Sequence, residues 1–214
     1  MWGDKITYLR ITPKYDIINH KKHRRKKMRN NIYVGLVHYP VYNKNESIVA
    51  TSVTNFDIHD ISRTCRTYDI KKYFIINNVD AQQELTNRII NYWTEGDGID
   101  FNKNRKEAFE NTDLEDTVQT AVETIKKIEG KEPKIITTSA RIFPNTVSYS
   151  DLGKEIVEDE SPYLILFGTG WGLTEEIMNM SYKILEPIRG KTKYNHLSVR
   201  SAVSIILDRL LGEN

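Results

Sequence analysis

From residue 32 onward, short runs of β-branched and aromatic residues alternate with longer segments in which apolar residues have helical spacing. This alternation predicts β-α units built on a mostly parallel sheet, because parallel strands need a long crossover connection that a helix usually supplies. The strands are expected at 32–39, 72–77, 134–139, 163–168 and 183–186. The helices are expected at 58–68, 81–93, 114–128, 149–157, 173–180 and 199–211.

Residues at the ends of several expected helices support this interpretation. Asp113 precedes the helix expected at 114–128 and Gly130 follows it, and both residue types are typical of helix ends. Asp57 and Ser198 precede the first and the last expected helices. We expect both to be N-caps, since a short oxygen-bearing side chain can accept hydrogen bonds from the first free N–H groups.

Residues 32–214 are expected to form one domain. This part of the 214-residue chain contains no internal repeat and no linker rich in Pro, Gly or Ser. Within it, the polar segment 94–104 contains two glycines and is expected to be a surface loop.

The first 31 residues differ sharply in charge from the rest. They hold ten Lys or Arg and two Asp, whereas residues 32–214 hold 21 basic and 27 acidic residues. Three interpretations stay open for this basic extension. It is an upstream segment placed before a native start at Met28, a flexible arm that binds nucleic acid phosphates, or an ordered element.

Composition excludes several classes of protein. The single cysteine, Cys65, excludes an internal disulfide and a multi-thiolate metal site. No apolar run reaches the roughly 18 residues of a membrane helix, and the N-terminus lacks the apolar core of a secretory signal. These features indicate a cytoplasmic protein and predict neither a membrane contact nor a metal site.

Three glycines stand within five residues at 168, 170 and 172, directly after an apolar strand. Glycine permits positive φ and lets a ligand approach the backbone, so the loop is able to offer amide groups to a nucleotide-like cofactor. The spacing is neither that of a Walker loop nor that of the Rossmann fingerprint. The competing interpretation is a tight turn that packs Trp171 into the core.

Two further segments gather polar groups. Asn195 and His196 stand just before the last expected helix, and capping by Ser198 does not explain them. His196 is a candidate base, ligand contact or packed loop residue. Arg63, on the polar face of the first expected helix, either binds a phosphate or carboxylate or is simply solvated.

In combination these motifs resemble the SPOUT, or α/β-knot, superfamily of S-adenosylmethionine (SAM)-dependent RNA methyltransferases, and in particular a bacterial branch of it. The resemblance runs from residue 32 to the end, and four strings carry it: VGLVHYPV (34–41), TSVTNFDIHD (51–60), FGTGWGL (167–173) and YNHLSVRS (194–201). It implies an α/β fold whose C-terminal part forms a deep trefoil knot, SAM bound in that knot, an RNA substrate (tRNA or rRNA) and a homodimer.

The resemblance also implies which residues hold SAM. They lie in three loops and at the start of the last helix: Thr138, Ser139, Gly168, Thr169, Gly170, Gly172, Ile188, Gly190, Asn195, His196, Leu197 and Ser201.

Two catalytic residues follow from the same resemblance. Residues 57–70 resemble the first motif of the ribose 2′-O-methylating branch, in which Arg63 matches the catalytic arginine. Asp57 stands where that branch has asparagine, so the acceptor is either a base nitrogen or a ribose 2′-OH. Arg63 is expected to orient a phosphate or stabilise a developing anion, with Asp57 or His196 as the general base.

Two other functions compete with methyl transfer. The chain is alternatively a knotted module that binds SAM or a nucleotide without catalysis, or a plain α/β enzyme whose glycine loop contacts a mononucleotide.

Overall fold

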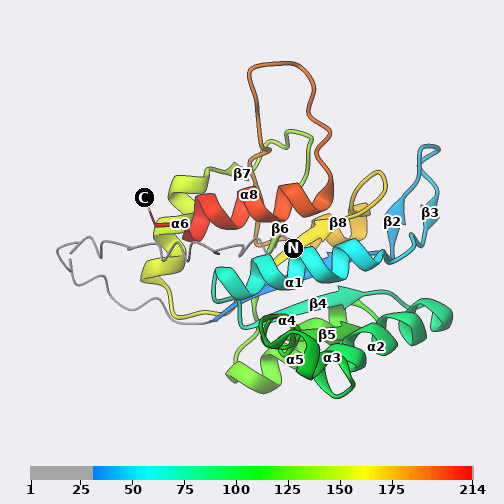
Figure 1. Cartoon of the computed structure of the whole chain (residues 1–214). Coiled ribbons are helices and arrows are strands. Elements are labelled where there is room, and N and C mark those ends of the chain that lie inside the picture. Colours follow the sequence, from blue (N-terminus) through cyan, green and yellow to red (C-terminus); the bar gives the residue numbers. More distant parts are fainter. Residues whose placement is uncertain (1–30, 214) are drawn as a thin grey trace, which may run out of the picture.

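The computed structural model describes residues 31–213, and a seven-stranded sheet forms the centre of this part. Figure 1 shows helices packed around the sheet. All its neighbouring strands pair in parallel, in the order β5-β4-β1-β8-β6-β9-β7. This confirms the predicted α/β class with a mostly parallel sheet. The strands are β1 (Ile32–Val37), β4 (Lys72–Ile76), β5 (Thr112–Glu115), β6 (Lys134–Thr137), β7 (Thr146–Val147), β8 (Tyr163–Gly168) and β9 (Lys183–Leu185).

Helices cover both faces of this sheet. On one face, buried residues pack from α1 (Asn55–Thr67), α2 (Asp80–Thr94), α4 (Lys103–Phe109), α6 (Tyr149–Glu158) and α8 (Val199–Leu211). The other face carries α5 (Val118–Glu129) and α7 (Glu175–Asn179). The single turn α3 (Gly98–Phe101) joins α2 to α4, and a small antiparallel hairpin, β2 (Val41–Tyr42) with β3 (Ile48–Val49), projects beyond the end of β1.

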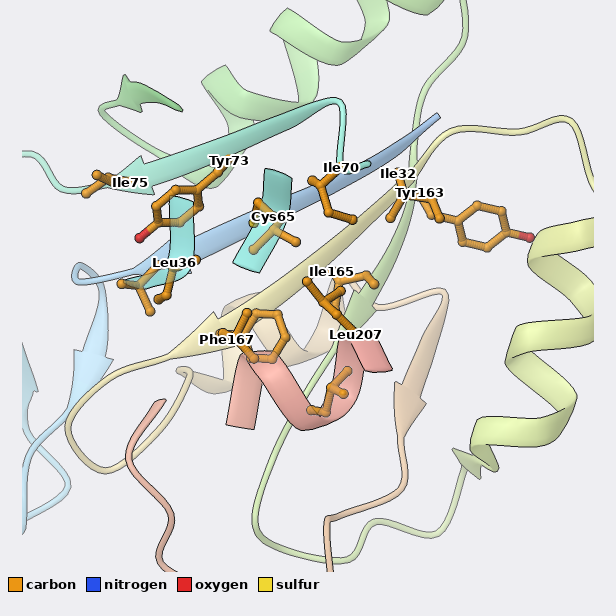
Figure 2. Close-up of a cluster of buried hydrophobic side chains, with 14 of the residues drawn as sticks. Ile32, Leu36, Cys65, Ile70, Tyr73, Ile75, Tyr163, Ile165, Phe167 and Leu207 are labelled. Carbon is orange, nitrogen blue, oxygen red and sulfur yellow. The ribbon is translucent and has the colours of Figure 1, made fainter. Parts of the chain in front are cut away.

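The central strand β1 has all six of its residues buried. Val34 and Leu36 face the α1 and α8 side, whereas Tyr33 and Val37 face α5. Figure 2 shows the first of these layers, in which Leu36 lies among apolar side chains of β4, β8 and α8. A strand covered on both faces must be apolar throughout, which is why it was predicted correctly as a continuous run.

The starts of α5 and α1 differ from the prediction. The helix expected from 114 begins at Val118, because residues 112–115 pair with β4 as β5 and Thr117 caps the helix. Its predicted end at Gly130 is confirmed, with φ of 71°. Asp57 is not an N-cap, since α1 starts two residues earlier and Thr54 accepts the hydrogen bond of the Asp57 backbone N–H.

Of two other local predictions, the cap at Ser198 is confirmed and the loop at 94–104 is wrong. Ser198 caps α8 as expected, accepting a hydrogen bond from Ser201 N. The segment 94–104 is not one loop, because α3 and the start of α4 lie within it and the Asn102 side chain caps α4.

The arrangement of strands determines where a site can form. The carboxyl ends of β1, β8, β6 and β9 lie side by side at one edge, because these four are neighbours in a parallel sheet. Ligands of open α/β sheets bind at this edge. The threading of the C-terminal knot stays a prediction, and the interpretations of the basic extension fall on residues 1–30, outside the described part.

Within the described part, no helix is long and apolar enough to cross a bilayer.

Candidate functional site

A cavity of about 750 Å³ opens at the carboxyl ends of these four strands. Its volume lies within the range of pockets that enclose a cofactor-sized molecule. Its wall consists of residues at and after the ends of β1, β6, β8 and β9, of the segment leading into α1 and its first turn, and of α8. The three loops expected to hold SAM therefore meet in one place.

Most of the predicted site residues line this cavity. They are Asp57, Thr138, Ser139, Gly168, Thr169, Gly170, Gly172, Ile188, Asn195, His196 and Leu197. Gly190, Ser201 and Arg63 are not among the lining residues. The Ser201 side chain instead hydrogen-bonds that of Ser198 at the start of α8, at 2.9 Å.

The hairpin β2–β3 holds the glycine loop in place. Trp171 N donates to Tyr42 O at 2.9 Å, and Tyr42 N donates to Gly172 O at 3.0 Å. Gly170 and Gly172 have φ of 57° and 107°, a region that side-chain-bearing residues rarely adopt. The Trp171 side chain is 58% exposed, so the interpretation of this loop as a turn that buries Trp171 is wrong.

Asn195 joins two of the cofactor loops. Its Nδ2 donates to the carbonyl oxygen of Ala140 at 2.9 Å. This contact explains the asparagine that capping of α8 left unexplained, because it fixes the long loop before α8 against the end of β6. The neighbouring His196 is exposed and lies edge-on to Tyr194, with ring centroids 5.6 Å apart.

Asp57 brings a carboxylate to the cavity wall from the first turn of α1. It is 8% exposed, and its Oδ2 accepts a hydrogen bond from Thr54 Oγ1 at 2.6 Å. Its Oδ1 lies 3.5 Å from Nε of Arg200. Another nitrogen of the same guanidinium, Nη1, donates to Asp60 Oδ2 at 2.9 Å. These contacts orient the carboxylate from the helix side.

Arg63 lies six residues after Asp57 on α1. Six residues rotate a helix by about 600°, which places the two side chains roughly 120° apart. Arg63 is exposed and lines a separate, shallower groove between α1 and α8. Within one copy of the chain, the two predicted catalytic residues therefore belong to different surfaces.

His38 is a lining residue that the sequence interpretation did not assign to the site. It directly follows β1, is 1% exposed, and its Nδ1 lies 3.0 Å from Thr51 Oγ1. Thr169 Oγ1 lies 2.5 Å from the same Thr51 oxygen and donates to Val37 O at 3.0 Å. This network connects β1, the segment before α1 and the glycine loop.

The hydrogen bonds around His38 converge on the Thr51 hydroxyl. Thr51 Oγ1 lies within hydrogen-bond distance of His38 Nδ1 and Thr169 Oγ1, and it donates to the carbonyl oxygen of His38 at 3.4 Å. The other ring nitrogen of His38, Nε2, is buried and has no hydrogen-bond partner within residues 31–213. Burial lowers the pKa of His38 to about 4, although the Asp57 charge opposes that shift.

Positive charge borders the same cavity. Arg141 and Lys193 line it and are both exposed. Among the residues that the structure describes, no group of three or more His, Cys, Asp or Glu side chains is placed to hold a metal ion. The cavity therefore combines glycine backbone, one buried carboxylate and a cationic margin.

Comparison with known proteins assigns the family. The model of a family described as SAM-dependent RNA methyltransferase matches residues 31–212. The chain is 44% identical over 187 residues to an uncharacterized protein from Aquifex aeolicus, covering 87% of this chain and 91% of that protein.

A second relative has a named activity. Over 196 residues the chain is 40% identical to a tRNA (guanine-N(1)-)-methyltransferase from Oleidesulfovibrio alaskensis, covering 90% of this chain but 45% of that protein. The chain thus spans less than half the length of this relative.

A solved structure shares the fold. It is the SpoU methyltransferase AviRb from Streptomyces viridochromogenes in complex with its cofactor AdoMet, with a TM-score of 0.52 and 14% identity. The likeness covers 89% of this chain and 60% of that one.

The pKa of His38 generates a prediction about stability. Between pH 6.5 and pH 4 the unfolded chain binds a proton on His38 and the folded chain does not, so stability falls as pH decreases through this window. Relative to His38→Asn, which keeps a donor near Thr51 but does not titrate, the wild type should lose roughly 2 to 3 kcal/mol more between pH 7.5 and pH 4.5. Urea unfolding at both pH values measures this difference, and equal losses would contradict a buried neutral His38.

Proposed function

The chain belongs to the SAM-dependent RNA methyltransferase family, and we propose that it transfers the methyl group of SAM to a ring nitrogen of a base in tRNA. The observation that carries this proposal is the cavity at the carboxyl ends of β1, β8, β6 and β9, with the Asp57 carboxylate in its wall. The name of the Oleidesulfovibrio relative supports tRNA as the substrate class. Such a reaction agrees with the cytoplasmic location expected from the sequence.

The residues of the cavity fit SAM. A Cβ built on Gly172 would meet no atom within 4 Å, so the backbone there is open to a ligand. We place SAM between this glycine loop, Thr138 with Ser139, and the segment around Asn195, where main-chain groups would bind adenosine. When bound, SAM supplies a methyl group that its sulfonium has already activated, so the chain must mainly position the acceptor and exclude water.

Asp57 is our candidate for the general base. A ring nitrogen that carries a hydrogen loses its proton on methylation, and this N–H is a stronger acid than a ribose hydroxyl. A carboxylate that is oriented by Thr54 and Arg200 is suited to accept that proton. This role fits the aspartate that replaces the asparagine of the ribose-methylating branch.

Arg63 acts, in this proposal, on the site of a second copy of the chain. It lies outside the cavity of its own copy, in the exposed groove between α1 and α8. A two-fold dimer formed through these helices would present Arg63 to the partner's cavity, where its guanidinium would orient a phosphate or stabilise negative charge. In this proposal the homodimer expected from the resemblance is required for catalysis, because each cavity needs Arg63 of the other copy.

The methylated product tests the choice of acceptor. RNA from a strain that lacks the gene is treated with the enzyme and labelled SAM, digested to nucleosides and analysed by mass spectrometry. We expect the label on a base. Asp57→Asn should lower kcat about 100-fold to 10,000-fold with unchanged affinity for SAM, since it removes the base and preserves the shape. A 2′-O-methylated nucleoside, or full activity of the variant, would refute this assignment.

Mixing two inactive variants tests whether Arg63 acts across the dimer. Arg63→Ala keeps an intact cavity, and Asp57→Asn keeps the arginine. If the site combines both copies, unfolding and refolding an equal mixture should restore about one quarter of wild-type activity, because half of the dimers then contain one complete site. If Arg63 acts within its own copy, the mixture stays inactive.

A further inference from the structure

Trp171 is a large apolar side chain that the fold exposes beside the cavity. It is 58% exposed and lines the cavity. The backbone around it is fixed, since Trp171 N and Gly172 O both hydrogen-bond Tyr42 of the hairpin. The loop therefore presents the indole from an anchored backbone instead of packing it.

The glycines on either side of Trp171 explain how the loop exposes its side chain. Gly170 and Gly172 both have positive φ, and a Cβ on Gly170 would lie 2.9 Å from Tyr42 O. Side chains at 170 or 172 would strain or displace the loop that carries the indole. The three-glycine pattern thus serves the placement of Trp171 as well as access to the backbone.

The surroundings of Trp171 favour RNA as its partner. Arg141 and Lys193 line the same cavity. Within residues 31–213 neither forms an ion pair, because no carboxylate oxygen lies within 4 Å of its charged nitrogen atoms. A second exposed ring, Tyr194 at 72%, stands on the loop before α8. Aromatic rings interspersed with unpaired cations are typical of surfaces that bind unpaired nucleotides, whose bases stack on the rings.

We infer that Trp171 is a stacking platform for an unpaired base of the RNA substrate at the mouth of the cofactor cavity, a role that rests on the proposed function. The class of substrate follows from this geometry. Residues 32–214 hold 27 acidic and 21 basic residues, so the net charge of this part of the chain gives little general attraction for a duplex backbone. Stacking on a splayed base supplies binding affinity that net charge does not. Because only an unpaired base can be splayed out, the protein should prefer an RNA loop or bulge to a continuous RNA helix.

Methyl transfer by three variants tests this role. The substrate is the small-RNA fraction of a strain that lacks the gene. Trp171→Ala should raise the KM for this RNA about 5-fold to 150-fold, the effect of losing one base–aromatic stack, while Trp171→Phe keeps most of the affinity. Phe101→Ala, which removes an 82% exposed ring on α3, is the matched control and should leave KM unchanged.

Calorimetric titration with SAM separates the two ligands that Trp171 is able to contact. We expect Trp171→Ala to bind SAM with wild-type affinity. The inference is overturned if the variant has the wild-type KM for RNA, or if its affinity for SAM falls together with that for RNA, because the indole would then pack on the cofactor.

A direct binding measurement keeps this inference distinct from the proposed function. If the wild type transfers no methyl group to this RNA, the proposed function fails. Quenching of tryptophan fluorescence by the same RNA then decides the role of Trp171. Because Trp2 and Trp93 also fluoresce, the amplitude of quenching is compared between the wild type and Trp171→Phe. A smaller amplitude in the variant supports stacking on Trp171, and an equal amplitude refutes it.

Discussion

The parallel pairing of β1 with β8, and of β8 with β6 and β6 with β9, is the constraint on which the rest of the structure depends. Because these strands run in the same direction, the loops that follow them emerge at one edge. His38, the glycine loop and the segment around Thr138 are brought together in this way, although they are far apart in the sequence. The hydrogen bonds that place these strands are thus the origin of the cavity.

Specific contacts then turn adjacent loops into a defined site. Asn195 ties the loop before α8 to Ala140, and the network of His38, Thr51 and Thr169 ties the end of β1 to the glycine loop. These hydrogen bonds join loops that already lie near one another at the edge of the sheet. The hairpin β2–β3 adds a further anchor through Tyr42, and the anchored loop leaves the indole of Trp171 exposed.

The strands of the centre could be predicted from sequence because burial on both faces requires continuous apolar runs, as in β1 and β8. The edge strand β5 could not, since Leu114 is its only apolar residue and also fits the helical spacing of the segment that follows. Asn195 and the residues at 138–139 were predicted to hold SAM through resemblance, and they line the cavity. His38 was missed because its place in the site depends on its contact with Thr51 and on its position in the cavity wall, which local sequence pattern does not reveal. Ser201 was expected among the residues that hold SAM, but it lies outside the cavity and its side chain hydrogen-bonds that of Ser198 at the start of α8. Arg63, expected to be catalytic, lines the groove between α1 and α8.

The central claim is that SAM occupies the cavity between the glycine loop and the loop before α8. A crystal structure of the protein grown with S-adenosylhomocysteine tests it most directly. The account predicts the nucleoside between residues 168–172 and 195–197, within hydrogen-bond distance of their main-chain groups and with Asp57 facing the side where the methyl acceptor enters. A ligand bound in the α1–α8 groove, or a cavity that stays empty at saturating ligand, would contradict it.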